Sequence, residues 1–152
     1  MIPEKHIELV YFIGIGGIGM SALARYYNRA GKIVMGYDKT PSPLTTELEM
    51  EGIAVHFSDT VHDLPTLVRT LSKEAILVVY TPAIPSTHNE LNWFINNEYR
   101  VLKRSEVLGN ITRESSSIAI AGTHGKTTTS SLTAHIMHAS GKGCNAFLGG
   151  IA

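Results

Sequence analysis

The chain has 152 residues, of which 43% are hydrophobic and 17% charged, a composition typical of a soluble globular protein with a proper core. Thirteen Lys and Arg residues balance thirteen Asp and Glu residues, so no overall field attracts nucleic acid or an acidic membrane. Cys144 is the only cysteine, which excludes an internal disulfide and fits a reducing compartment. With no signal-peptide pattern and no apolar stretch near the ~20 residues of a membrane span, we expect a cytoplasmic protein without a membrane partner.

Short apolar runs alternate with amphipathic stretches over the first 110 residues. Strands are predicted at residues 8–13, 32–37, 53–57, 75–81 and 99–102. Helices are predicted after Gly19, at 43–50 with Ser42 as N-cap, at 63–72, at 88–97 with Ser86 or Thr87 as N-cap, and at 105–111. This alternation is typical of a parallel sheet covered on both faces, so we predict a Rossmann-like, doubly wound α/β fold.

The composition becomes polar after residue 110, and residues 112–116 are predicted to link a first domain, 1–111, to a second unit, 117–152. In that unit a strand is predicted at 117–121, a helix at 127–140 and a further strand at 145–148. A single βαβ unit cannot bury both faces of a sheet. We therefore expect residues 117–152 to be the first piece of a P-loop ATP-binding domain, and the chain to be part of a longer protein.

The first glycine-rich loop, Gly14-Ile15-Gly16-Gly17-Ile18-Gly19, follows the first predicted strand and opens a helix. Its glycines allow a tight turn, close approach of the backbone to a diphosphate, and close packing of helix on strand. Asp38 ends the second strand, where an acidic residue usually binds a ribose hydroxyl. Asp38 could equally cap the turn that follows it. The pattern predicts a site for NAD or another nucleotide diphosphate.

The second loop, Gly122-Thr123-His124-Gly125-Lys126-Thr127, is two residues shorter than the usual Walker A spacing but keeps its functional end. Its amides would surround phosphates, Lys126 would reach the β and γ oxygens, and Thr127 would donate its hydroxyl to Mg²⁺. His124 either touches the transferred phosphoryl group or only hydrogen-bonds to the backbone. Two loops of different type predict two phosphate-bearing ligands.

Both loops together resemble the Mur ligases of bacterial cell-wall synthesis. The resemblance rests on Tyr11-Phe-Ile-Gly-Ile-Gly-Gly-Ile-Gly-Met-Ser21 and on Ala121-Gly-Thr-His-Gly-Lys-Thr-Thr-Thr129. Three further segments also resemble segments of this family and support the resemblance: Tyr80-Thr-Pro-Ala-Ile84, Lys103-Arg-Ser-Glu-Val-Leu108 and Phe147-Leu-Gly-Gly150.

The resemblance implies an enzyme that binds UDP-N-acetylmuramate on its first domain and MgATP on its central domain. The muramoyl carboxylate would be phosphorylated, and an amino acid, L-alanine in the branch that this chain is most similar to, would attack the acyl phosphate. The implied UDP-sugar contacts are Gly14, Ile15, Gly16, Gly17, Ile18, Gly19, Asp38 and Thr81. The implied ATP phosphate contacts are Gly122, Thr123, His124, Gly125, Lys126, Thr127 and Thr128, with Lys126 catalytic and Thr127 at the Mg²⁺.

Three alternatives stay open at this point. A sister ligase that attaches a whole peptide to UDP-N-acetylmuramate shares the loop types. A NAD-binding Rossmann module is favoured by Asp38 but leaves the second loop without a role, and a P-loop NTPase leaves the first loop without one. The sequence does not predict an oligomeric state. Because the resemblance assigns further ATP and amino-acid contacts to residues beyond 152, we expect this chain alone not to catalyse.

Overall fold

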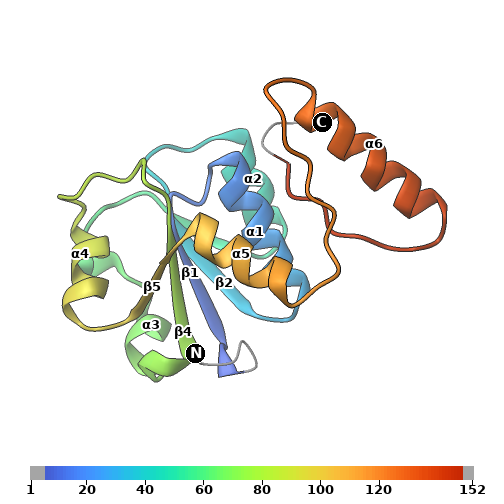
Figure 1. Ribbon diagram of the computed structural model, residues 1–152. Helices are drawn as coiled ribbons and strands as arrows, with labels where there is room; N and C mark the ends of the chain where they lie inside the picture. Colours follow the sequence, from blue (N-terminus) through green and yellow to red (C-terminus); the bar gives the residue numbers. More distant parts are fainter. Residues whose placement is uncertain (1–5, 149–152) are drawn as a thin grey trace.

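The structure is a computed structural model that describes residues 6–148. A five-stranded parallel sheet in the order β3-β2-β1-β4-β5 forms its centre (Figure 1). The strands are β1 (Leu9–Ile13), β2 (Ile33–Tyr37), β3 (Ala54–His56), β4 (Ile76–Tyr80) and β5 (Arg100–Lys103). The helices are α1 (Ile18–Arg29), α2 (Pro43–Met50), α3 (Thr66–Thr70), α4 (Asn89–Asn96), α5 (Arg104–Arg113) and α6 (Lys126–Ala139). This is the predicted doubly wound α/β fold.

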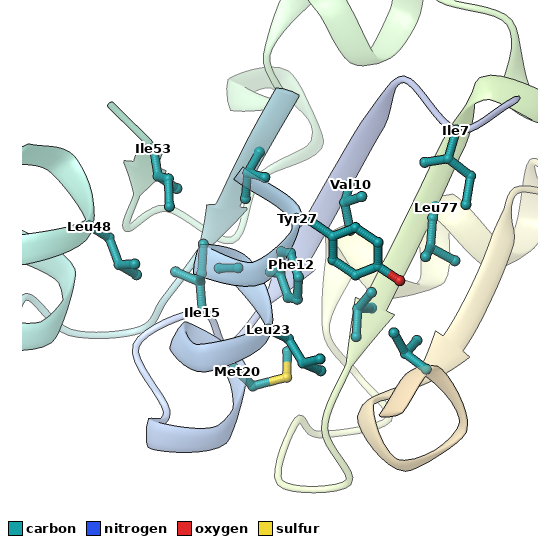
Figure 2. Packing of buried hydrophobic residues seen from close by; sticks show 14 of the residues in the cluster. Ile7, Val10, Phe12, Ile15, Met20, Leu23, Tyr27, Leu48, Ile53 and Leu77 are labelled. Carbon is teal, nitrogen blue, oxygen red and sulfur yellow. The ribbon is translucent and has the colours of Figure 1, made fainter. Parts of the chain in front are cut away.

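Strand β1 lies at the middle of the sheet, and all five of its residues are buried. Alternate side chains enter different cores, because successive residues of a strand point to opposite faces. Val10 and Phe12 pack with α1, α2 and α5, and Figure 2 shows them in one cluster with Ile15 from the following loop. Leu9, Tyr11 and Ile13 pack on the other face, which α3 and α4 cover (Figure 1). Burial on both faces explains why the strand reads as a continuous apolar run.

Within residues 6–111, the predicted third helix and the predicted cap of the fourth helix differ from the structure. The helix predicted at 63–72 is reduced to the five residues of α3, with short 3₁₀ turns at Val61–Asp63 and Lys73–Ala75. Pro65 stands before the helix as its N-cap with extended backbone, and Leu71 is extended again after it. The segment therefore runs as three separate turns, although its apolar residues Leu64 and Val68 are buried as a helix would bury them.

The cap of α4 also differs, because neither Ser86 nor Thr87 is the N-cap. His88 takes that position, and its Nδ1 accepts a hydrogen bond from the Leu91 amide at 3.3 Å. The carboxylate of Asp59 accepts from the amides of Asn89 and Glu90, each at 3.1 Å. A helix needs acceptors for its first amides, and here a residue thirty positions away supplies them.

From residue 112 to residue 148, the structure agrees with the prediction only in forming helix α6. Helix α5 continues through Arg113, so it includes the first two residues of the predicted linker. Residues 117–121 and 145–148 are not strands, because no neighbouring strand in the described part of the chain pairs with them. Helix α6 forms as predicted but buries none of its residues, and it stands apart from the sheet (Figure 1). No helix among residues 6–148 is long and apolar enough to cross a membrane.

A buried polar cluster lies within the core on the α3 and α4 side of the sheet. The Tyr11 hydroxyl donates to Glu90 Oε2 at 2.7 Å and lies 2.6 Å from Nε2 of His56. The Glu90 side chain is fully buried, and this burial raises the pKa of its carboxyl group to about 8. Burial also lowers the pKa of His56 below its usual value. Near pH 7 these pKa values favour the neutral forms of Glu90 and His56, so the cluster consists of hydrogen bonds between uncharged side chains.

We predict that Glu90 makes the stability of this chain fall as pH rises. The pKa of Glu90 is near 4.5 when exposed and about 8 when folded, so the folded state holds its proton more tightly. Its stabilising contribution is complete below pH 4.5 and is lost between pH 4.5 and 8, at up to about 1.4 kcal/mol per pH unit. Glu90→Gln keeps an acceptor for Tyr11 but cannot ionise.

The measurement is urea unfolding of the wild type and of Glu90→Gln at several values between pH 5 and 8. The free energy of unfolding of the wild type relative to the variant should decrease with pH. Glu49→Gln, at an exposed position, is the control and should show no such trend. A constant difference between wild type and Glu90→Gln over this range would contradict the prediction.

Candidate functional site

The first glycine-rich loop lies at the carboxyl ends of the strands, where the strand order changes direction between β1 and β4. This is the position at which open α/β sheets bind their ligands. Gly14 has φ +88°, a conformation that favours glycine. A Cβ atom on Gly14 would lie 3.3 Å from side-chain atoms of Thr81 and Ile84, so the loop packs directly on the residues that leave β4.

The end of β2 holds the first part of this loop in place. The amides of Gly14 and Ile15 both donate to the carbonyl oxygen of Tyr37, at 2.8 and 3.0 Å. The Gly16 amide donates to Oδ2 of Asp38 at 2.7 Å. The Ile15 side chain is fully buried in the core, so this residue anchors the loop and offers no side chain to a ligand.

Asp38 binds backbone amides with both of its carboxylate oxygens. Besides the bond from Gly16, Oδ1 accepts from the Thr40 amide at 3.3 Å, which is the turn-capping contact considered from the sequence. The structure thus gives Asp38 a local role in the turn and a second role in fixing the loop. A ribose contact is untested by this geometry and stays a prediction. The side chain is half-buried and lies beside the loop.

The second part of the loop has free amides. The Gly17 amide donates to the Gly14 carbonyl at 3.3 Å, but within residues 6–148 the amides of Ile18 and Gly19 have no acceptor. These two amides are the first of helix α1, where the helix dipole adds partial positive charge. They form the part of the loop that can bind a phosphate group.

Arg104 is a site residue that the sequence reasoning missed. It is the first residue of α5, directly after β5, and its Nη1 and Cζ atoms lie 3.1 and 3.4 Å from the place of a Cβ on Gly19. The guanidinium group therefore lies over the first turn of α1, in space that glycine leaves open. The sequence feature that could have identified Arg104 is its position immediately after a predicted parallel strand. Residues in that position lie at the carboxyl ends of the strands, where the glycine-rich loop also lies.

A cavity of about 340 Å³ adjoins the loop. Its walls come from the start of α1, the exit of β4, α5 and the end of the described chain; the lining residues are Gly17, Gly19, Met20, Leu23, Thr81, Ala83, Arg104, Leu108, Phe147 and Leu148. Thr81 lies against Gly14 and Asp38 against Gly16, so the structure brings these residues together at the carboxyl ends of the strands. Their contact with a UDP-sugar stays a prediction. None of residues 122–128 lines this cavity.

The second loop is exposed and stands by itself. Gly122 and Gly125 have φ +159° and +76°, and Gly125 is the N-cap of α6. The ammonium group of Lys126 donates to the carbonyls of Gly122 and Thr123, so the lysine closes back on its own loop. Within the described residues the amides of Lys126, Thr127 and Thr128 have no acceptor. Free amides, a left-handed glycine at 125 and one lysine are groups that fit a nucleotide phosphate.

Solved structures of two ligases resemble this chain over most of its length. One is the UDP-N-acetylmuramate-alanine ligase of Thermotoga maritima, with a TM-score of 0.78 and 29% identity over 94% of this chain and 32% of that one. The other is the UDP-N-acetylmuramate:L-alanyl-gamma-D-glutamyl-meso-diaminopimelate ligase of Neisseria meningitides, with a TM-score of 0.75 and 27% identity over 89% of this chain and 40% of that one.

Sequence comparison gives a nearer relative and a family. The UDP-N-acetylmuramate–L-alanine ligase of Cytophaga hutchinsonii is 59% identical over 96% of this chain. The chain spans about a third of the length of that curated relative, 31%. The model of the Mur ligase family, catalytic domain, matches residues 9–116, which include the first loop, the whole sheet and Arg104. The chain therefore belongs to the Mur ligase family.

Proposed function

We propose that this chain supplies the UDP-sugar site and the ATP phosphate loop of a ligase that joins L-alanine to UDP-N-acetylmuramate in peptidoglycan precursor synthesis. The observation that carries the proposal is the pair of free amides, Ile18 and Gly19, on a loop pinned by Asp38 in a chain of the Mur ligase family. The first domain is residues 1–111, and 117–152 begin the ATP-binding domain. The whole ligase acts in the cytoplasm.

In this proposal the first loop binds the diphosphate of UDP-N-acetylmuramate. The amides of Ile18 and Gly19 donate to phosphate oxygens, and the glycines at 14, 16, 17 and 19 let the ligand approach the backbone. Asp38 lies beside the loop on the β2 side and accepts from a ribose hydroxyl. Thr81 lies on the β4 side and contacts the sugar end of the ligand.

The second loop binds ATP. When bound with Mg²⁺, ATP supplies the γ-phosphoryl group that activates the muramoyl carboxylate as an acyl phosphate, which the amino group of L-alanine then attacks with release of phosphate. The groups of this chain that would hold the nucleotide are the amides of residues 122–128 and the Lys126 ammonium, with the Thr127 hydroxyl at the Mg²⁺. Lys126 neutralises charge that develops during phosphoryl transfer. To do so it must leave the carbonyls of Gly122 and Thr123.

The choice of L-alanine as amino acid rests on the relatives. The curated relative at 59% identity is named for L-alanine, whereas the solved peptide-adding ligase is 27% identical. The fold does not separate these two classes, since their TM-scores are 0.78 and 0.75. No residue of the described loops is assigned to the amino acid.

We predict that UDP and UDP-N-acetylmuramate stabilise this chain and that NAD does not. A ligand at 100 times its dissociation constant adds about 2.7 kcal/mol, which a thermal-shift measurement resolves. Gly16→Val should abolish the shift, because a Cβ at Gly16 would lie 2.9 Å from both Asp38 Oδ2 and Thr45 Cγ2 and would disturb the loop.

The control variant for this experiment is Gly109→Ala in α5, where a Cβ meets nothing within 4 Å. It should retain the full shift with the uridine ligands. Circular dichroism verifies that Gly16→Val is folded before ligand is added. A larger shift with NAD than with UDP-N-acetylmuramate would move the assignment to a dinucleotide-binding module.

We further predict that the 152-residue chain binds MgATP weakly and forms no UDP-N-acetylmuramoyl-alanine. The second loop is open to solvent, and the described residues contain no cluster of acidic or histidine ligands for a metal. Lys126→Ala should remove the weak MgATP binding without changing the thermal shift with UDP. Product formation above the no-enzyme control, measured by chromatography, would show that the catalytic groups lie within this chain.

A further inference from the structure

Arg104 is a cation without a partner at the mouth of the first site. Within residues 6–148 it forms no ion pair and no side-chain hydrogen bond. Its side chain is half-buried, and it is the one charged residue among those that line the 340 Å³ cavity in the described chain. A guanidinium group is always charged, so its position beside two free amides makes the site strongly favourable for an anion.

No carboxylate of the described site competes for this charge. The Asp38 carboxylate already accepts from the amides of Gly16 and Thr40. Glu106, close in sequence on α5, accepts from the Lys103 amide at 2.8 Å and caps the helix. The charge of Arg104 is therefore available for a ligand.

The sheet order fixes which end of a UDP-sugar lies near Arg104. Asp38 follows β2, the glycine-rich loop follows β1, Thr81 follows β4 and Arg104 follows β5, in the spatial order of the strands. If the ribose lies at Asp38, the ligand runs from there across the loop toward β5. The phosphate farther from the nucleoside then lies nearer to Arg104.

We propose that Arg104 binds the β-phosphate of the UDP-sugar, the phosphate that carries the sugar, together with the Ile18 and Gly19 amides. This assignment rests on the proposed function of the first loop. The planar fork of N–H groups suits two oxygens of one phosphate. Gly19 has a second role here, because its missing side chain leaves the space in which the guanidinium group lies.

The test compares three ligands of increasing length, UMP, UDP and UDP-N-acetylmuramate, by protein-observed NMR titration of the 152-residue chain. Arg104→Gln should weaken UDP and UDP-N-acetylmuramate binding by about 10- to 100-fold, the range for a hydrogen bond to a charged group. UMP, which lacks the β-phosphate, should lose less than about 3-fold. Arg104→Lys should recover part of the UDP affinity.

Two further variants separate ligand contact from a structural role. Arg113→Gln, on the exposed far end of the same helix, should bind all three ligands as the wild type does. Gly19→Ala displaces the guanidinium group and should weaken UDP binding more in the wild type than in the Arg104→Gln background.

The outcomes distinguish this inference from the proposed function. Equal losses for UMP and UDP, no loss for UDP, or a loss confined to UDP-N-acetylmuramate would each overturn the β-phosphate assignment. Failure of the wild-type chain to bind any of the uridine ligands would instead overturn the proposed function of the first loop.

Discussion

The candidate site depends on how the end of β2 holds the loop that follows β1. The Tyr37 carbonyl accepts from two successive loop amides, and the Asp38 carboxylate accepts from the third. A charge-assisted hydrogen bond of 2.7 Å is among the stronger local restraints that a protein can place on a backbone. Because these amides are satisfied within the fold, the two that remain free, Ile18 and Gly19, lie together at the start of α1. The neighbouring strand therefore determines which loop amides remain free for a ligand.

The two glycine-rich loops have different structural support, although both carry free amides of the kind that fit a phosphate group. The first follows a strand that is buried on both faces, and Ile15 anchors the loop in the core. The second follows residues 117–121, which pair with no strand in the described chain, and precedes a helix that buries no side chain. Its shape comes from its own glycines and from the bonds of Lys126 to the loop carbonyls. From this contrast we propose a preorganised diphosphate site at the first loop and a weaker, solvent-exposed ATP loop at the second.

The sheet could be predicted from sequence because each strand is a short apolar run and each crossover has helical spacing. The first loop could be predicted because glycine spacing and Asp38 are local features. Arg104 was not assigned, because its contact with Gly19 joins segments that follow two different strands and are far apart in the sequence. The cap of α4 by Asp59 and the contact of Tyr11 with Glu90 were missed for the same reason. In each case the contact depends on a residue that is distant in the sequence, and a local pattern does not show which distant residue becomes a neighbour.

The most direct measurement of the central claim is a titration of the ¹⁵N-labelled chain with UDP, followed by the backbone amide signals. The account predicts that the signals of Ile18 and Gly19 move most, since these amides are free to donate to the diphosphate. Signals of the second loop, residues 122–128, should stay in place. Largest changes in the second loop, or no change at Ile18 and Gly19 while UDP binds, would contradict the account.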